Sequence, residues 1–202
     1  RITIANHGPE QAPIHILPSI WLRNSWDWDI DGEAPVTKPS IALEDDTLLI
    51  KHESLGKFRF HTAVSGDRPE KTKWLFTEND TNHESLGDRK NDTPYTKDAF
   101  HRYIVKGEKK AISPKKKGTK AAAHFVFDIP PGESVTIMAR LHPIGEDNAI
   151  QGFDQFHETV DARQRESDEF YAEIIPSGIS DEERMICRQG YAGLLWTKQF
   201  FH

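Results

Sequence analysis

The sequence predicts a mainly β protein, an antiparallel β-sandwich that is followed by helices. Two observations predict it. Up to about residue 148, short segments of alternating apolar and polar residues are separated by turn residues. From about residue 150, the apolar residues recur instead at helical spacing. Strands with one apolar face pack as facing antiparallel sheets, so the first part is expected to share one core.

Two pairs of strands have the clearest alternation, and we predict that each pair forms a hairpin. The first pair is 48–52 and 58–60. The second pair is 123–129 and 135–141, joined by the turn Pro130-Pro131-Gly132-Glu133. Weaker patterns predict four more strands, at residues 2–6, 13–22, 73–77 and 101–105.

The helical part is predicted to contain two helices. The first follows residue 150 and has a thin apolar stripe on an acidic surface, and the break at Pro176-Ser177-Gly178 ends it. Ser180 and Glu183 then have the spacing of a capping box. The helix that they begin places Met185, Ala192, Trp196 and Phe200 on one face, and we expect this face to be buried against other helices.

Composition excludes several classes of protein. The net charge of −6 argues against a general nucleic-acid binder. No apolar run approaches the roughly 20 residues that span a bilayer, so no membrane partner is expected. Cys187 is the only cysteine, which excludes an internal disulfide and a cysteine-based zinc site. The chain begins and ends within regular patterns, so we interpret it as a fragment of a larger, cytoplasmic protein.

Three patterns that could bind ions are interpreted as ordinary surface features. Asp27–Gly32 matches the start of a calcium loop, but Lys38 stands where its final glutamate is required. The ten histidines show no metal-binding spacing and are expected to be hydrogen-bonded or on polar strand faces. The segment 106–120 has seven lysines, where phosphate could bind, but a solvated loop is the preferred interpretation. No metal and no cofactor are therefore predicted.

The densest aromatic cluster, Trp21 to Trp28, is a candidate for binding sugars. Indole faces stack on the C–H faces of sugar rings, and neighbouring Asp, Asn and Arg side chains bond sugar hydroxyls. Trp21 follows a predicted strand, and we expect it to be a buried core anchor. For Trp26 and Trp28, a core position and a sugar contact both remain open. The loop character around Trp28 favours a contact with a ligand or another domain.

Six short stretches, in order, resemble the microbial glucosidase-like branch of glycoside hydrolase family 63, which includes relatives of the α-glucosidase that trims mannosyl-oligosaccharides. The likeness covers nearly the whole chain. The stretches are Ile-Ala-Asn (4–6) with Ile-His-Ile-Leu-Pro (14–18), Trp-Leu-Arg-Asn-Ser-Trp (21–26), Leu-Phe-Thr-Glu-Asn (75–79), Lys-Asp-Ala-Phe-His-Arg-Tyr (97–103), Gly-Thr-Lys-Ala-Ala-Ala-His (118–124) and Gly-Tyr-Ala-Gly-Leu-Leu-Trp-Thr-Lys-Gln-Phe (190–200).

The resemblance implies a domain plan and a function. Residues 1–148 would form an N-terminal β-sandwich of the super-sandwich type, 149–179 a helical linker, and 180–202 the first helix of a truncated (α/α)6 catalytic barrel. The family cleaves α-glucosidic bonds in oligosaccharides with inversion, using two carboxyl groups. Both would lie C-terminal to this chain, so no catalytic residue is assigned here, and the fragment alone is expected to be inactive. The sandwich would pack on the barrel.

Residues that could approach the sugar follow from the same resemblance and from the aromatic cluster. They are Trp26, Trp28, Lys97, Asp98, His101, Trp196 and Lys198. For Trp196 the alternative is burial in the barrel core, and we favour that alternative. Two other functions remain open for the chain, a carbohydrate-binding β-sandwich without hydrolysis and a scaffold that binds a protein partner through the acidic helix and the lysine-rich segment.

Overall fold

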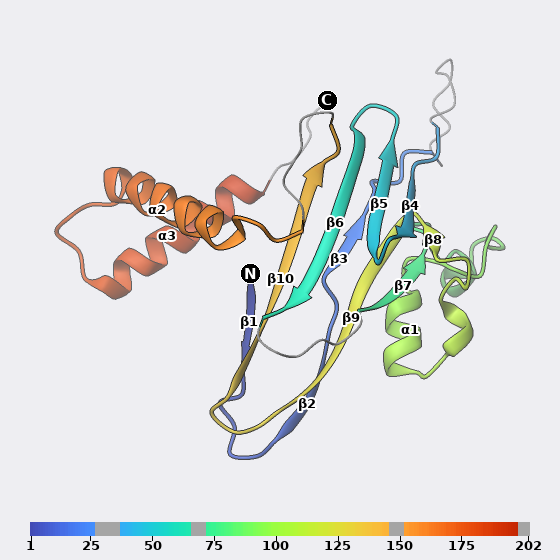
Figure 1. The fold of residues 1–202 in the computed structure, drawn as a ribbon, viewed down its shortest axis with the longest axis horizontal. Coiled ribbons are helices and arrows are strands. Elements are labelled where there is room, and N and C mark those ends of the chain that lie inside the picture. Colours follow the sequence, from blue (N-terminus) through green and yellow to red (C-terminus); the bar gives the residue numbers. More distant parts are fainter. Residues whose placement is uncertain (27–36, 66–71, 146–151, 198–202) are drawn as a thin grey trace. The chain divides into compact units, whose positions relative to one another are not determined.

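The computed structural model describes residues 1–26, 37–65, 72–145 and 152–197. It divides the chain into two compact units, Arg1–Phe153 and Asp154–His202. In the described residues, antiparallel sheets predominate, and three α-helices accompany them (Figure 1). The predicted mainly β class is therefore confirmed. Trp28, Lys198 and the calcium-like stretch Asp27–Gly32 lie outside the described residues.

The first unit contains two antiparallel sheets. The strands of the larger sheet follow the order β1-β10-β6-β5-β4-β8. In the smaller sheet, β9 is central, with β2 and β3 along one edge and β7 along the other. The strands are β1 (Ile2–Ala5), β2 (Ala12–Ile16), β3 (Ser19–Trp21), β4 (Ser40–Glu44), β5 (Thr47–His52), β6 (Gly56–Val64), β7 (Lys73–Thr77), β8 (Lys117–Gly118), β9 (Lys120–Ile129) and β10 (Ser134–Pro143).

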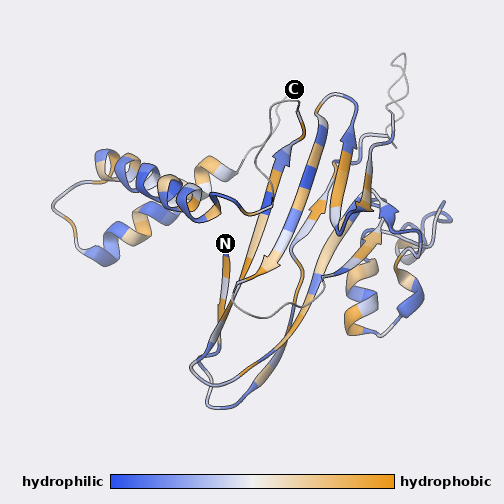
Figure 2. Ribbon diagram, viewed as in Figure 1, coloured by the Kyte–Doolittle hydropathy of each residue, from blue (hydrophilic) through white to orange (hydrophobic). Residues whose placement is uncertain are grey.

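The apolar faces of the two sheets form the core between them. One cluster joins Leu48 and Phe60 of the larger sheet to Phe76 and Ala121 of the smaller. A second cluster joins the aromatic residues of β9 to Val135 and Ile137 of β10. Figure 2 shows the matching alternation of polar and apolar residues along the strands. The predicted 48–52/58–60 hairpin is present as β5 and β6, in register from Leu48↔Phe60.

The second predicted hairpin is wrong, although both of its strands exist. β9 pairs with β2, β3 and β7, whereas β10 pairs with β1 and β6 in the other sheet. The turn at Pro130–Glu133 therefore carries the chain from one sheet to the other. Alternation reveals which face of a strand is apolar but not which strand is its neighbour. Here the two apolar faces meet across the core instead of lying side by side.

The strand predicted at 101–105 is instead part of helix α1 (Ala99–Val105). The strands β7 and β9 are apolar on both faces, because Leu75 and Ala122 are as buried as their neighbours Phe76 and Ala121. Phe100 of α1 packs on Leu75 and Ala122 and covers this second face. The helix thus supplies the cover that a doubly apolar strand requires, and Figure 1 shows it beside β7.

Trp21 is not the core anchor that the sequence predicted. Its side chain is 59% exposed, and the neighbouring Leu22 takes the core position at 9%. The inward residues of this part of the chain are Ile14, Ile16 and Ile20, all at even positions. Trp21 is at an odd position, so the alternation turns its indole to the outer face. Burial was predicted because Trp21 continues the strand of Ile14 and Ile16, but its odd position places it on the opposite face.

The second unit is a pair of helices, α2 (Phe156–Ile174) and α3 (Asp181–Trp196). The predicted capping box is confirmed, because Ser180 and Glu183 each accept a hydrogen bond from the other's backbone N–H. The apolar face of α3 is exposed in this unit, with Met185 55% and Trp196 84% exposed, so the helices expected to bury it are not among the described residues. Within the described residues, no helix combines the length and apolar character needed to cross a bilayer.

We predict that Gly118→Ala destabilises the first unit. A Cβ at this position would lie 2.2 Å from the backbone oxygen of Thr77, so either β8 or β7 would have to move. Overpacking of this kind costs about 1–3 kcal/mol. Urea unfolding would measure the loss, with Gly145→Ala as the control, because a Cβ there meets nothing within 4 Å. Equal stability of the two variants would show that the strands do not approach this closely.

Candidate functional site

A polar site of the first unit surrounds the carboxylate of Asp80, which follows β7. We call Asn24, Trp26, Lys38, Glu78 and Asp80 the Asp80 cluster. Asp80 accepts hydrogen bonds from Trp26 Nε1 at 3.1 Å and from Asn24 Nδ2 at 3.2 Å. Lys38 Nζ lies 3.3 Å from its other oxygen. Residues from three distant parts of the sequence therefore meet on one carboxylate.

A second carboxylate shares the same lysine. Lys38 Nζ is 3.3 Å from Glu78 Oε2 and lies over the ring of Trp26, 5.3 Å from its centroid. Thr119, which is buried, donates its hydroxyl to the same Glu78 oxygen at 2.7 Å. Burial alone would lower the pKa of Lys38, but the charges of Glu78 and Asp80 outweigh it and raise that pKa. The lysine is therefore held as a cation between two carboxylates.

Backbone hydrogen bonds fix this cluster on the sheet. Leu22 N donates to Thr119 O at 3.0 Å, and Asn79 Nδ2 donates to Leu22 O at 2.9 Å. Asn79 N donates to the hydroxyl of Thr119 at 2.8 Å. The segments that follow β3, β7 and β8 are thus tied to one another where these strands end. Such a network positions polar side chains with little freedom, as a recognition site requires.

Lys97 and Asp98 lie beside the cluster, through the loop that follows Asp80. Lys97 N donates to Asp80 O at 2.9 Å, and its ammonium reaches the hydroxyl of Thr81 at 3.0 Å. Asp98 accepts from the hydroxyl of Thr96 at 2.5 Å and from Asn82 Nδ2 at 2.9 Å. The structure therefore brings three of the predicted residues, Trp26, Lys97 and Asp98, to one region.

The charges in this region perturb one another. Burial alone would raise the pKa of Asp98. The hydrogen bonds from Thr96 and Asn82 outweigh burial and bring this pKa below its usual value. Lys120 donates to Lys97 O at 2.8 Å and lies over the Phe100 ring. Burial, and then the charge of Lys97, lower the pKa of Lys120. An ionised carboxylate has about four acceptor sites, so Asp98 can accept a bond from a ligand hydroxyl beside those from Thr96 and Asn82.

The other predicted site residues are elsewhere. His101 is exposed on α1, and the structure records no hydrogen bond from it to the Asp80 cluster. Trp196 belongs to the second unit, where it is exposed at the end of α3. Sequence reasoning did not select Lys38, Glu78 or Asp80, and it included Asn24 only as a member of the Trp21–Trp28 cluster. The only available signal was their proximity in sequence to Trp26 and to the stretch 75–79.

The histidines form two hydrogen-bonded pairs. His15 Nδ1 and His124 Nε2 are 2.8 Å apart, and His61 Nε2 and His142 Nε2 are 3.1 Å apart. Burial is the main cause of a lowered pKa in both His61 and His124. Among the described residues, no group of three or more His, Cys, Asp or Glu side chains could hold a metal ion. The prediction that the histidines are hydrogen-bonded on strand faces is confirmed for these four.

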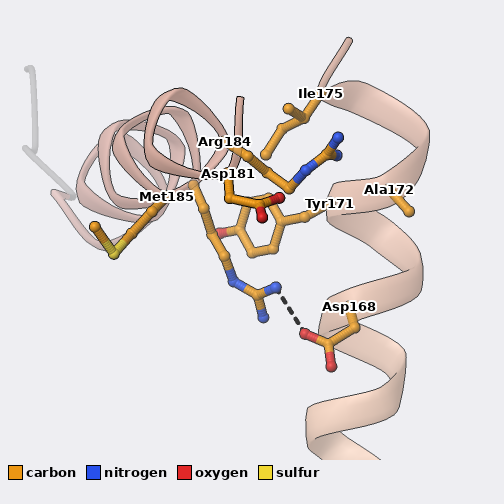
Figure 3. A pocket seen from close by; sticks show the side chains of 8 residues that line it. Asp168, Tyr171, Ala172, Ile175, Asp181, Arg184 and Met185 are labelled. Carbon is orange, nitrogen blue, oxygen red and sulfur yellow. Dashed lines mark ion pairs between the residues drawn. The ribbon is translucent and has the colours of Figure 1, made fainter. Parts of the chain in front are cut away.

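The helical unit has a hollow of its own, of about 400 Å³, between α2 and α3 (Figure 3). Two of its charged groups pair with each other. Arg188 lies 2.6 Å from Asp168 Oδ1, donates to Ser167 Oγ at 3.1 Å and stacks on the ring of Tyr171. These contacts join the two helices. We therefore interpret it as a packing feature of the helical pair.

Comparison with known proteins finds a relative in yeast. The whole chain aligns with an uncharacterized protein of Saccharomyces cerevisiae, with 33% identity over 230 aligned residues. The chain spans 21% of the length of that relative. No protein-family model matches the chain, and no solved structure matches it. The function therefore has to be argued from the site.

Asp98 is predicted to make the stability of the first unit sensitive to acid. Because its folded pKa is depressed below the ordinary 3.8, the ionised carboxylate stabilises the fold above that pH, and this stabilisation is lost as the pH falls through the folded pKa. Asp98→Asn should therefore lose less stability than the wild type between about pH 5 and about pH 2. Urea midpoints across this range measure the difference, and the exposed Asp92→Asn should keep the wild-type slope. Identical slopes for Asp98→Asn and the wild type would contradict the assignment.

Proposed function

We propose that the chain is the N-terminal β-sandwich, linker and first barrel helix of an inverting α-glycosidase that acts on oligosaccharides. In this proposal the sandwich is of the super-sandwich type, and α3 begins an (α/α)6 barrel. The catalytic carboxyl groups lie in that barrel, C-terminal to His202. The role of the first unit is to pack on the barrel and to supply one wall of the sugar site.

The observation that carries the proposal is that most of the stretches that resemble glycoside hydrolase family 63 come together in the folded first unit. Four of the six meet at the Asp80 cluster, although they are far apart in sequence. They supply Asn24 and Trp26 (21–26), Glu78 and Asn79 (75–79), Lys97 and Asp98 (97–103), and Thr119 and Lys120 (118–124). Stretches that resemble a family only by chance have no reason to assemble in one place. Their convergence supports a shared functional origin.

Two further findings are compatible with this plan. The described strands all precede α2 and α3, and the apolar residues of α3 are exposed in a way that suits a helix with partners outside this unit, since Met185 and Trp196 are both more than half exposed. The yeast relative is also much longer than the stretch it shares with this chain, with room for a large catalytic domain.

The Asp80 cluster has the chemistry of a sugar subsite wall. Its carboxylates accept hydrogen bonds from hydroxyl groups, and its lysine and amide donate them. The same carboxylates accept bonds from Trp26, Lys38 and Thr119, which keeps them from serving as the proton donor of the reaction. We therefore assign the cluster to substrate positioning and propose no catalytic residue within it.

A carbohydrate-binding sandwich without hydrolysis is the second candidate, and the exposed indole of Trp21 favours it. An aromatic ring that is 59% exposed on an outer strand face is available to stack on a sugar. In that case Trp21→Ala would abolish binding of the isolated chain to an oligosaccharide. In the glycosidase proposal, the same variant leaves the affinity of the complete enzyme nearly unchanged.

The central test is hydrolysis by the complete gene product compared with that of residues 1–202 alone. We expect the complete protein to release sugar from α-linked oligosaccharides with the β-anomer formed first, as inversion requires. The 202-residue chain should release none, because both catalytic carboxyl groups are absent from it. Proton NMR of the fresh product distinguishes the anomers. Hydrolysis by the short chain that disappears when one of its own Asp or Glu residues is replaced would contradict the proposal.

Trp26→Phe is predicted to raise the KM of the complete enzyme severalfold, because the Asp80 carboxylate loses a charged hydrogen bond that holds it in place for the substrate. The variant keeps a ring but removes the indole N–H that Asp80 accepts at 3.1 Å. The change in kcat should be smaller, since the cluster positions the substrate and does no chemistry. Trp21→Phe is the matched control and should leave KM within about twofold. An unchanged KM in Trp26→Phe would remove the cluster from the sugar site.

A further inference from the structure

The lysine-rich segment 106–120, which the sequence suggested to be a solvated loop, is largely irregular but includes short regular elements. It begins at Lys106, the C-cap of α1, and contains the 3-10 helix η2 (Lys109–Ala111) and the strand β8, which pairs with β4. Its last lysine, Lys120, begins β9. The lysines of this segment are therefore placed by the fold, and only some of them face a cavity.

That cavity has a volume of about 430 Å³ and lies among the start of β4, the residues 93–95 and the segment 113–119. Lys115 and Lys117 line it, together with Lys38 at the start of β4. Among the described residues, neither Lys115 nor Lys117 has a recorded ion-pair partner, whereas Lys38 is neutralised by Glu78 and Asp80. The cavity therefore has two positive charges that its own walls do not balance.

The backbone that presents the two lysines is held in a demanding conformation. Lys116, between them, has φ of +51°, in the left-handed region that side chains with a Cβ rarely adopt. Its carbonyl accepts a hydrogen bond from Leu43 N at 3.0 Å. Two residues later, Gly118 lies so close to Thr77 that a Cβ would not fit. Strained and tightly anchored backbone of this kind concentrates at ligand sites.

The remaining walls are rich in hydroxyl groups. Ser40, Thr93, Tyr95, Ser113 and Thr119 line the cavity, and Glu78 contributes the only carboxylate among the described lining residues. Hydroxyls both donate and accept, and a carboxylate accepts from ligand hydroxyls. The cavity thus combines a cationic part for an anion with a polar part for hydroxyl groups. Inorganic phosphate would use only the first part, and a neutral sugar only the second.

We propose that this cavity binds a phosphorylated sugar, with the phosphate between Lys115 and Lys117 and the sugar hydroxyls toward Glu78 and the wall hydroxyls. Lysine ammonium groups bind phosphate as point charges, and a phosphate monoester carries nearly two negative charges at neutral pH. The proposal concerns binding alone and does not depend on glycosidase activity, so it stands or fails separately from the proposed function.

The test is isothermal titration of residues 1–202 with glucose 6-phosphate, inorganic phosphate and glucose as three separate probes. We expect glucose 6-phosphate to bind more tightly than phosphate, and glucose not to bind measurably. The double variant Lys115→Gln/Lys117→Gln should bind glucose 6-phosphate at least about tenfold more weakly, because each lost charged hydrogen bond alone can account for that factor. Both side chains are exposed, so thermal unfolding should be unchanged.

The matched control is Lys109→Gln/Lys110→Gln, which removes the same charge from exposed lysines of the same segment outside the cavity. It should bind glucose 6-phosphate as the wild type does. Three results would each overturn the proposal. They are no binding of glucose 6-phosphate, equal affinity for inorganic phosphate, and an equal loss of affinity in the control variant.

Discussion

The structure of the first unit depends on β9, whose first half is buried on both faces from residue 121 to residue 125. One face packs across the core on β10, and the other packs under α1. Burial on both faces fixes the strand in place, because a shift by one residue would exchange the contents of the two faces. At its N-terminal end, Thr119 and Lys120 emerge from this fixed position. The polar site is built there, where the surrounding backbone is most constrained.

The site follows from that constraint through close backbone contacts. Gly118 allows β8 to approach β7, and this approach places the hydroxyl of Thr119 against both Asn79 and Glu78. Asp80 then collects donors from the tryptophan-rich stretch and from Lys38. Immediately before Gly118 in the sequence, Lys115 and Lys117 line the hydroxyl-rich cavity. One anchored segment thus serves two polar sites, with Glu78 and Lys38 common to both.

Much of the secondary structure could be predicted from the sequence, because alternation and capping are local. The strands β5, β6 and β7 and the capping box of α3 were predicted close to their observed positions. What could not be predicted was pairing. The apolar faces of β9 and β10 suggested a hairpin, but strand partners depend on the whole sheet. The helix α1 was not predicted, because it covers the second apolar face of β7 and β9, and that requirement is visible only in the folded sheet.

For the site, the aromatic cluster and a family resemblance indicated Trp26, Lys97 and Asp98 as candidates. Neither indicated Asp80, which is hydrogen-bonded to both Trp26 and Lys97. Asp80 is one acidic residue among 32 in the chain, and only the folded sheet brings it to Trp26. Trp21 illustrates the opposite error, since it continues the strand of Ile14 and Ile16 but its odd position places it on the opposite face. Local patterns therefore located the region, and tertiary structure selected the residues within it.

The claim that the Asp80 cluster forms part of a sugar site is tested most directly by a structure of the complete gene product bound to a non-hydrolysable α-linked oligosaccharide. The account predicts a sugar ring within hydrogen-bond distance of the cluster, with Trp26 and Asp80 hydrogen-bonded to each other as they are here at 3.1 Å. A sugar bound wholly within the remainder of the protein, with the cluster facing solvent, would contradict it.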